Sequence, residues 1–389
     1  MILAHKIQLD LTTAQREYCA RACGTSRFVW NWALEEWTRQ YKAGEKPNGF
    51  KLKKQFNAVK YQQFPWLESI HRDAHAQPFI NLQKAFVNFF KKRAKHPTFK
   101  KKGVRDSFAV ANDKLKIDGK CIRLPMIGWV CLTEQVRFNG KIMAATVSRT
   151  ADRWFVSLQM DVGSYQKPRV GDGVVGIDLG IETTVTLSSG EKLNSPKALK
   201  MKMKRLRRLS RRHSRKQKGS NNRRKAANRL SKLHWRVKCQ RNDWLHKLTT
   251  RICRENQSVV IEQLSVKNMM ANRRLARAIS DESWYEFCRQ LGYKAQIYGT
   301  EVITAPKFYP SSKTCSNCGH AKVELALDER TYACSECGFV GDRDLNAARN
   351  LSRLGLSRSN ACGHHVRPVR TKAVMVEAGT RPCSLVNTN

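Results

Sequence analysis

The sequence predicts a multidomain protein of the α+β class, because three stretches of the chain differ in the period of their hydrophobic residues. Residues 11–95 repeat apolar side chains at the spacings of three and four that are typical of helices. Residues 106–162 alternate apolar and polar side chains in short runs, as strands do. From residue 171 onward, short apolar runs are separated by long helical patterns. A chain of 389 residues is long enough for two or three such domains.

The composition predicts a folded protein that binds a polyanion. Hydrophobic residues make up 41% of the chain, and 73 Lys and Arg against 31 Asp and Glu give a formal net charge of +42. Nucleic acid is the expected partner of so basic a protein, and an anionic membrane surface is the alternative. We expect no membrane span, because no apolar run approaches the ~18 residues that one needs. The N-terminus lacks the layout of a signal peptide, so we expect a cytoplasmic protein.

The first 165 residues predict a small β-barrel or sandwich into which a helical domain is inserted. The first strand is expected at Ile2–Leu9, and T-T-A-Q-R-E begins the helices, with Thr13 as a possible N-cap supported by Gln15 or Glu17. Later strands are expected at Ser107–Val110, Lys114–Ile117, Arg123–Leu124, Trp129–Leu132, Val136–Phe138, Ala144–Ser148 and Trp154–Gln159. The predicted domains are the barrel in residues 1–10 and 96–165, and the helical domain in residues 11–95.

A long stretch without acidic residues predicts a basic helical hairpin over residues 192–256. No Asp or Glu occurs in the fifty-one residues from Lys192 to Asn242, and Gly219–Asn222 (G-S-N-N) predicts the turn between two helices. A charge run is usually a solvated face, but a basic face this long favours contact with a phosphate backbone. A calmodulin-type or membrane contact is the alternative. The candidate nucleic-acid contacts are Lys204, Arg205, Arg207, Arg208, Arg211 and Arg212.

Three carboxylates in apolar surroundings predict a metal site. Asp178 lies in the run V-V-G-I-D-L-G, and Glu262 ends a second apolar run, S-V-V-I-E-Q-L. D-R-D-L-N-A-A-R-N then begins a helix, with Asp342 as its N-cap and Asp344 in its first turn. A buried carboxylate is costly unless a cation or hydrogen bonds compensate it, and Mg²⁺ prefers oxygen ligands. Asp178, Glu262 and Asp344 are therefore candidate Mg²⁺ ligands, although each alone could have a structural role.

The order of the elements around these carboxylates resembles the RNase H-like nuclease fold. Hairpin strands are followed by helix, strand, helix, strand and helix, with an amphipathic helix expected from Trp284 to about Gly299 and a strand at Glu301–Thr304. Ala347 and Ala348 are small enough for the last helix to lie close against a sheet. Two Mg²⁺ ions ~3.5–4 Å apart would activate a water molecule and stabilise the leaving 3′ oxygen in phosphodiester cleavage.

Four of the thirteen cysteines have the spacing of a zinc ribbon. C-S-N-C-G-H and C-S-E-C-G-F place Cys315, Cys318, Cys334 and Cys337 in a C-x2-C-x15-C-x2-C pattern, and each pair is followed by a glycine that permits a tight turn. Four thiolates would complete a tetrahedral Zn²⁺ site, so this ion would be structural. Two disulfides or a redox dithiol are the alternatives. The other nine cysteines show no pairing pattern, which favours free thiols in a reducing compartment.

Together these motifs resemble the TnpB (OrfB) family of transposon-encoded proteins, which is related to the miniature type V CRISPR effectors. The resemblance rests on G-I-D-L-G, V-V-I-E-Q-L, Y-P-S-S-K-T-C-S-N-C-G and D-R-D-L-N-A-A-R-N in that order. It extends to G-T-S-R-F-V-W-N (Gly24–Asn31) and N-L-Q-K-A-F-V-N-F-F (Asn81–Phe90), and so covers essentially the whole chain. It implies an RNA-guided DNA endonuclease that uses a transposon-end-derived guide RNA and cuts double-stranded DNA beside a short adjacent motif.

The resemblance also implies roles for individual segments. Residues 171–351 would form a RuvC-like nuclease domain that binds Mg²⁺ through Asp178, Glu262 and Asp344, with a Zn²⁺-binding ribbon inserted at residues 309–341. The barrel would be the wedge domain, and the inserted helices the recognition domain. Gln77 is a candidate contact to the adjacent motif, with a helix-surface amide as the alternative. Ser312 and Lys313 are candidate contacts to the scissile strand, with a role in a turn as the alternative.

The remaining expectations concern the tail, the compartment and the competing functions. Residues 352–389 are expected to form a flexible tail, because they contain three glycines and no helical pattern. The resemblance implies a bacterial or archaeal protein that is nucleoid-associated when bound to DNA. Three other functions stay open: a nuclease-silent guided DNA-binding repressor, a transposase that performs strand transfer, and a plain basic RNA-binding protein. A repressor would be expected to lack the carboxylates, which this chain keeps.

Overall fold

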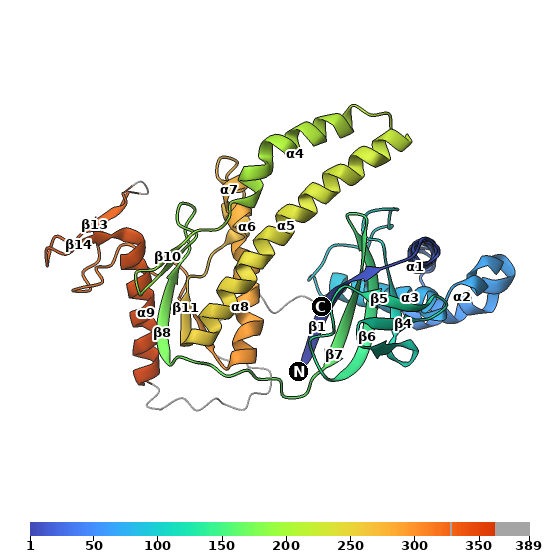
Figure 1. Cartoon of the computed structure of the whole chain (residues 1–389), viewed down its shortest axis with the longest axis horizontal. Coiled ribbons are helices and arrows are strands. Elements are labelled where there is room, and N and C mark those ends of the chain that lie inside the picture. The colour runs from blue at the N-terminus through green and yellow to red at the C-terminus, as the bar shows by residue number, and fades with distance from the viewer. Residues whose placement is uncertain (327–328, 362–389) are drawn as a thin grey trace. The chain divides into compact units, whose positions relative to one another are not determined.

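The protein, described here by a computed structural model for residues 1–326 and 329–361, divides into two compact units (Figure 1). The units are Met1–Tyr165 and Gln166–Asn389. The boundary between them falls where the strand-rich region was predicted to end. Each unit has its own hydrophobic core.

The N-terminal unit contains one seven-stranded antiparallel sheet with the strand order β2-β6-β7-β1-β5-β4-β3. The strands are β1 (Ile2–Asp10), β2 (Ser107–Ala111), β3 (Lys116–Asp118), β4 (Cys121–Leu124), β5 (Gly128–Leu132), β6 (Lys141–Thr150) and β7 (Arg153–Asp161). As predicted, the first strand joins the later ones, because β1 pairs with both β7 and β5. Within residues 1–165 the end strands β2 and β3 do not pair with each other, so the sheet does not close into a barrel.

The prediction of a strand at Val136–Phe138 is wrong. This segment has no strand pairing, and the backbone N–H of Arg137 instead donates to Nδ1 of His5 over 3.3 Å. The ring of Phe138 packs edge-on against the His5 ring. Val136 and Phe138 are both packed against the core of the unit. The alternation of apolar side chains therefore reflects burial here, without the pairing that defines a strand.

The inserted helical region is present, and its first helix begins one residue earlier than the N-cap predicted at Thr13 implies. Its helices are α1 (Thr13–Lys42), α2 (Gly49–Gln63) and α3 (Arg72–Phe90), with a 3-10 turn at Pro65–Ser69. The N-cap of α1 is Thr12, whose hydroxyl accepts from the N–H of Gln15 while the Gln15 side chain accepts from the N–H of Thr12. This reciprocal pair is a capping box, and it uses the glutamine that the sequence pointed to.

The C-terminal unit contains a five-stranded mixed sheet with the order β10-β9-β8-β11-β12. The strands are β8 (Gly173–Asp178), β9 (Val185–Leu187), β10 (Lys192–Leu193), β11 (Asn256–Ile261) and β12 (Glu301–Thr304), and β13 (Thr331–Ala333) and β14 (Val340–Asp342) form a separate hairpin. β8, β11 and β12 run parallel, whereas β9 and β10 add antiparallel strands beside β8. This is the predicted order of hairpin strands followed by strands that alternate with helices.

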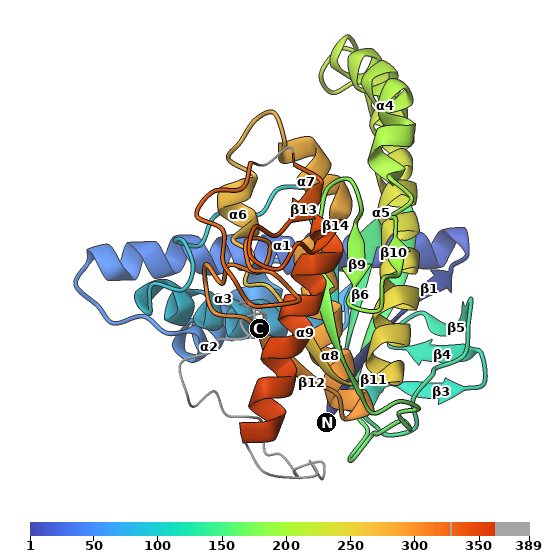
Figure 2. The same cartoon turned by 90° about the vertical axis from the view of Figure 1, so that its left-hand side faces the viewer.

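Helices cover both faces of this sheet. The described helices of this unit are α4 (Ala198–Ser214), α5 (Asn221–Glu255), α6 (Val266–Met269), α7 (Ala276–Glu282), α8 (Trp284–Tyr298) and α9 (Arg343–Ala361). Side chains of α5 and α8 share an apolar cluster with Ile177 and Ile261, while α9 lies across the opposite face (Figure 2). Because successive residues of a strand point to opposite faces, Gly176 and Asp178 are on the α9 face.

The helix α9 approaches β8 closely because both surfaces carry small residues. A Cβ atom at Gly176 would lie 2.0 Å from the carbonyl oxygen of Ala348 and 2.4 Å from the nitrogen of Ser352. Ala347 and Ala348 are buried, as predicted for a helix that lies against a sheet. The Ser352 hydroxyl also donates to the carbonyl of Val174 over 3.1 Å. These contacts fix α9 relative to β8.

The flexible tail predicted from residue 352 is wrong for residues 352–361, because α9 continues to Ala361. Gly355 does not end the helix but lies where the helix passes over the sheet. A Cβ atom there would be 2.6 Å from a methyl group of Val260 and 2.8 Å from one of Val174. The rest of the predicted tail, residues 362–389, lies outside the described residues. None of the described helices is both long and apolar enough to cross a membrane.

Candidate functional site

The three predicted carboxylates come from three elements of the C-terminal unit. Asp178 is the last residue of β8, and Glu262 directly follows the last residue of β11. These strands are parallel neighbours in which Ile177 pairs with Ile261, so the two carboxylates occupy equivalent positions at the ends of adjacent strands. Asp344 lies in the first turn of α9, the helix that packs on β8.

The three carboxylates interact electrostatically. Burial and the negative charges of Glu262 and Asp344 raise the pKa of Asp178 to about 8. Burial also raises the pKa of Glu262, although the hydroxyl of Ser311 donates a hydrogen bond to its Oε1. Arg343, whose Nε is 3.6 Å from Asp344 Oδ1, acts in the opposite direction on Asp178. A carboxyl group that is largely protonated at neutral pH marks a site with too little positive charge.

Asp342 has a different role, although it is only two residues from Asp344. Its Oδ1 accepts from the N–H of Leu345 over 2.9 Å, which makes it the N-cap of α9 as predicted. Its Oδ2 accepts from Nζ of Lys192 over 2.7 Å. Burial acts to raise the pKa of Asp342, but these hydrogen bonds outweigh it and lower the pKa. The chain itself therefore compensates the charge of Asp342.

A buried hydroxyl group lies beside Asp178. Thr186 pairs with Asp178 across β8 and β9, and residues opposite each other on paired strands project to the same face. Thr186 is fully buried, and its Oγ1 has no hydrogen-bond partner within the described part of the chain. An unsatisfied hydroxyl and an uncompensated carboxylate on one face are groups that a hydrated cation would satisfy. The residues present therefore fit a hydrated metal ion.

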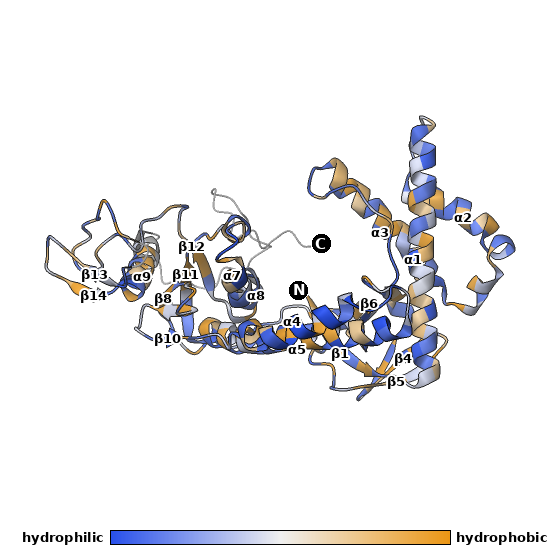
Figure 3. Ribbon diagram, turned by 90° about the horizontal axis from the view of Figure 1, so that it is seen from above, coloured by the Kyte–Doolittle hydropathy of each residue, from blue (hydrophilic) through white to orange (hydrophobic). Residues whose placement is uncertain are grey.

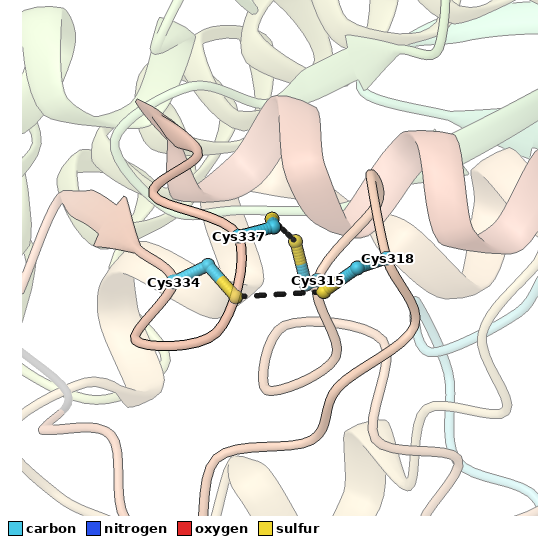
Figure 4. A group of neighbouring side chains, drawn as sticks. All are labelled: Cys315, Cys318, Cys334 and Cys337. Atoms are coloured by element: carbon cyan, nitrogen blue, oxygen red, sulfur yellow. Dashed lines mark hydrogen bonds between the residues drawn. The ribbon is translucent and has the colours of Figure 1, made fainter.

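The four predicted cysteines form a compact cluster (Figure 4). Their sulfur atoms all lie within 4.8 Å of one another, with 3.7 Å between Cys315 and Cys337 and 3.6 Å between Cys318 and Cys334. Zn–S bonds of ~2.3 Å place the sulfurs of a tetrahedral site about 3.8 Å apart, so this cluster could hold Zn²⁺. Among the described residues it is the only group of three or more His, Cys, Asp or Glu side chains with ligand atoms this close, and His320 is not part of it.

The loops around the cysteines have the conformations that metal binding requires. Gly319 and Gly338 adopt left-handed backbone angles, with φ of +82° and +68°, as the predicted tight turns need. The N–H of Phe339 and the side chain of Asn317 donate to Cys337 and lower the pKa of this thiol to about 6. The thiolate is the form of cysteine that binds metal.

Helix α9 joins the cysteine cluster to the carboxylates. Asn346 and Asn350, four residues apart, share a face of the helix. Nδ2 of Asn346 donates to the carbonyl of Thr314 over 2.7 Å, and Nδ2 of Asn350 donates to the carbonyls of Ser311 and Thr314 over 2.8 and 2.6 Å. Ser311 then donates to Glu262. One continuous set of hydrogen bonds thus runs from the segment before Cys315 to a predicted metal ligand.

The hydrogen bond to Glu262 comes from Ser311, a residue that the sequence analysis did not single out. Its neighbours Ser312 and Lys313 were predicted to contact the scissile strand. Ser311 is buried, and Ser312 is half-buried. Nζ of Lys313 donates to the carbonyl of Val323 over 2.7 Å at the surface. The only sequence signal for Ser311 is its place in P-S-S-K-T-C, which does not distinguish it from its neighbour. The proposed strand contacts of Ser312 and Lys313 stay predictions.

The helices α4 and α5 form the predicted basic hairpin, which projects from the sheet (Figure 1). Ser220 is the N-cap of α5 and accepts from the N–H of Arg223. Leu206 is buried, and the other members of the apolar edge of α4 (Leu199, Met203 and Leu209) are half-buried. The surface of α4 is largely hydrophilic (Figure 3). All six predicted contacts are exposed: Lys204, Arg205, Arg207, Arg208, Arg211 and Arg212.

Gln77 lies in the N-terminal unit, within α3. This helix begins at Arg72, seven residues before the Phe79 that the aromatic pattern marked. Nε2 of Gln77 donates to Oδ1 of Asn81 over 3.2 Å, which is an ordinary contact of a helix-surface amide. Its role at the adjacent motif stays a prediction.

Comparison with known proteins identifies the family. Residues 157–273 match an OrfB family described as "Probable transposase", and residues 284–351 match a "Cas12f1-like, TNB domain". A protein of Streptomyces pristinaespiralis named "Putative RNA-guided DNA endonuclease" is 38% identical over 381 residues, which cover 94% of this chain and 92% of the relative. The chain belongs to the TnpB (OrfB) family. A relative from Escherichia coli (strain K12), InsQ, has the same description and is 33% identical over 388 residues, which cover 94% of this chain and 95% of the relative.

The fold agrees with the predicted link between TnpB proteins and the miniature type V effectors. A Cas12f1 chain in a complex with sgRNA and target DNA superposes with a TM-score of 0.56 at 16% identity, covering 88% of this chain and 83% of that chain. Residues 1–46 match a family described as "Helix-turn-helix domain". In this TnpB protein those residues form β1, the single helix α1 and four residues that follow it, so no helix-turn-helix is present there.

Proposed function

We propose that this TnpB protein is an RNA-guided DNA endonuclease that hydrolyses phosphodiester bonds at Asp178, Glu262 and Asp344. The observation that carries the proposal is the position of the three carboxylates at the ends of β8 and β11 and the start of α9, together with the charges of Glu262 and Asp344 that help raise the pKa of Asp178 to about 8. The names of relatives that are 38% and 33% identical support the same activity.

Two Mg²⁺ ions bound by these carboxylates would activate a water molecule and stabilise the leaving 3′ oxygen. The proposed ligands are two carboxylates at the ends of adjacent strands and Asp344 on a helix that packs against Gly176. Ser311 orients Glu262, and the buried hydroxyl of Thr186 faces the same side of the sheet as Asp178. The carboxylates are more widely spaced than the four cysteine sulfurs. Two ions ~3.5–4 Å apart need a wider set of ligands than one ion does.

The nucleic-acid partners would be bound outside the carboxylate site. The exposed basic residues of α4 would contact the phosphate backbone of a transposon-end-derived guide RNA or its duplex with target DNA. Gln77 would contact the short adjacent motif of the target DNA, and Ser312 and Lys313 the scissile strand. One Zn²⁺ held by Cys315, Cys318, Cys334 and Cys337 would stabilise the ribbon.

Sequencing the RNA that co-purifies with the protein, followed by cleavage of a plasmid library, tests this function. The library should carry the complement of that RNA beside a randomised flank. We expect Mg²⁺-dependent linear products that share a short flanking sequence. Binding to the same plasmids without cleavage would favour the repressor, and the absence of a discrete co-purified RNA would contradict a guided function.

A second function, strand transfer, is favoured by the description of the family that matches residues 157–273 as a transposase. Hydrolysis and strand transfer could use the same carboxylates but give different products. Incubation with transposon-end DNA and a target plasmid separates them, because a transposase yields joined molecules. Linear plasmid without joined products would exclude strand transfer.

A further inference from the structure

Two adjacent carboxylates are buried away from the proposed metal site. Asp281 and Glu282 end α7, and their side chains are only 4% and 1% exposed. Neighbouring buried carboxylates are destabilising unless cations and hydrogen-bond donors surround both of them. Their partners belong to two different parts of the C-terminal unit, the basic hairpin and the segment that follows Asp178.

Asp281 holds both helices of the basic hairpin. Its Oδ1 accepts from the N–H of Leu199 over 3.0 Å, and its Oδ2 accepts from the N–H of Lys200 over 2.9 Å. These are N–H groups of the first turn of α4, whose own N-cap residue, Lys197, provides no side-chain cap. Nε and Nη2 of Arg241 in α5 also donate to Oδ1, over 3.0 and 2.8 Å. Asp281 therefore caps α4 from another helix and ties it to α5.

Glu282 holds the segment that joins Asp178 to β9. Its Oε2 accepts from the hydroxyl of Thr184 over 2.6 Å, and its Oε1 accepts from Nζ of Lys197. Nζ of Lys197 also donates to the carbonyl of Ile181 over 2.6 Å. Ile181 and Thr184 are three and six residues after Asp178. Lys197 therefore contacts both the segment after Asp178 and the carboxylate next to the cap of α4.

The connection between the two parts is under conformational constraint. Lys197 and Ser283 have left-handed backbone angles, with φ of +41° and +58°, which residues other than glycine rarely adopt. Lys197 is part of the network and directly precedes α4, and Ser283 directly follows Glu282. Ser195 adds two further bonds, from its N–H to Thr184 Oγ1 over 2.8 Å and from its hydroxyl to Glu282 over 3.0 Å. Such angles persist only where surrounding contacts impose them.

We propose that Asp281 and Glu282 are positioning residues that couple the basic hairpin to the carboxylate site. Without RNA, the exposed cations of α4 repel one another along the helix. RNA bound to this face removes that repulsion and so stabilises the first turn of α4. A stable first turn maintains the hydrogen bond from Lys197 to the carbonyl of Ile181. This hydrogen bond in turn orders residues 179–184. Metal binding at Asp178 is then favoured by RNA and favours RNA in return, because coupling between two sites is reciprocal.

This inference rests on the proposed function, in which α4 binds RNA and Asp178 binds a metal ion. It is tested on the full chain by hydrogen exchange of residues 179–184, with and without the co-purified RNA, in EDTA. We expect RNA to slow exchange in the wild type and not in Glu282→Gln. Glu286→Gln is the matched control, because Glu286 accepts from Arg289 and Gln290 of its own helix, and should behave as the wild type.

A second measurement is the Mg²⁺ concentration that gives half-maximal cleavage. We expect it to rise about fivefold or more in Glu282→Gln, the lower end of typical coupling between sites, while RNA affinity changes less than twofold. Thr184→Val removes one bond to Glu282 without removing a charge, and should give a smaller shift if Glu282→Gln fails to fold. RNA-dependent protection of residues 179–184 in Glu282→Gln equal to the wild type would overturn the coupling. A wild type that binds no RNA would instead contradict the proposed function.

Discussion

Ser311 donates a hydrogen bond to Glu262, and the carbonyl of the same serine accepts from Nδ2 of Asn350 over 2.8 Å. A residue four positions before the first cysteine of the cluster thus touches one of the predicted metal ligands. The cysteine cluster and the carboxylates are separate sites, but they share this segment and the helix α9. A change that unfolds the ribbon should therefore alter the position of the Glu262 side chain.

Loss of the Zn²⁺ proposed for the ribbon should impair cleavage, although this ion would take no part in the reaction. We expect Cys315→Ser to lose bound zinc and most of its DNA cleavage, because the unfolded ribbon no longer holds Ser311 against Glu262. Zinc content and cleavage are measured on the same samples. Cys131→Ser, an exposed cysteine on β5, is the control and should keep both. Full cleavage by zinc-free protein would show that the two sites are independent.

The two adjacent serines should differ in their effect on metal dependence. Ser311→Ala removes the donor that lowers the pKa of Glu262, so this pKa should rise further and Mg²⁺ should bind more weakly. The loss of one hydrogen bond to a charged group, about 1.5 kcal/mol, corresponds to roughly a tenfold higher Mg²⁺ requirement. Ser312→Ala should leave the Mg²⁺ requirement unchanged. Equal Mg²⁺ titrations for the two variants would contradict the assignment of Ser311.

A methyl group added at Gly176 should push α9 away from the sheet. The Cβ atom of Gly176→Ala would lie 2.0 Å from the Ala348 carbonyl, so we expect a loss of about 1–3 kcal/mol in the free energy of unfolding. Urea unfolding of the full chain measures it. Gly173→Ala, at the start of the same strand, has no atom within 4 Å of the added Cβ and should change the free energy little. Equal stability of the two variants would mean that the helix can shift without cost.

The parts of the site that carry local signals could be predicted from the sequence. Asp178 and Glu262 each end an apolar run, and Asp344 follows an N-cap, so their elements are specified within a few residues. The cysteines were predictable for the same reason, since their spacing encodes the turns. Thr186 and Ser311 could not be found this way, because what distinguishes them is a neighbour brought close by folding. Ser311 is 49 residues from Glu262 along the chain.

The errors in the predicted fold have a common physical origin. Alternating apolar residues indicate burial on one side of a segment, and Val136 and Phe138 are partly buried in a segment that pairs with no other strand. A glycine considered without its spatial neighbours indicates a flexible backbone, and Gly355 was interpreted in this way. In the fold, Gly355 is the residue that lets α9 pass close to the sheet. In both cases the decisive partner lies far away in the sequence. Local pattern therefore predicted the elements better than the contacts between them.

Acid should destabilise the N-terminal unit through His75. Burial, with the charges of Lys60 and His71, lowers the pKa of His75 to about 4; Arg72 also lowers it, and Asp73 opposes them. Between about pH 6.5 and pH 4 the unfolded chain binds the proton that the folded chain excludes, so stability falls as pH falls, by about 3 kcal/mol in all. Hydrogen exchange of α3 in the full chain, at pH 7 and pH 5, measures this.

Replacing His75 tests the cause of that acid dependence. His75→Gln removes the titrating group, so the protection of α3 should change less between the two pH values than in the wild type. Its Nε2 has no hydrogen-bond partner among the described residues, so the substitution breaks no bond at that atom. An unchanged acid dependence in His75→Gln would assign the effect to other groups.

Cleavage of guide-matched plasmid by Asp178→Ala shows whether this carboxylate takes part in DNA hydrolysis, with Asp342→Asn as the control. Both variants lose one carboxylate near α9, but asparagine still serves as an N-cap and Asp342 is not among the proposed ligands. We predict that Asp178→Ala binds the guide RNA as the wild type does and produces no Mg²⁺-dependent cleavage, whereas Asp342→Asn still cleaves. Cleavage by Asp178→Ala at the wild-type rate would contradict the proposed role of Asp178 in DNA hydrolysis.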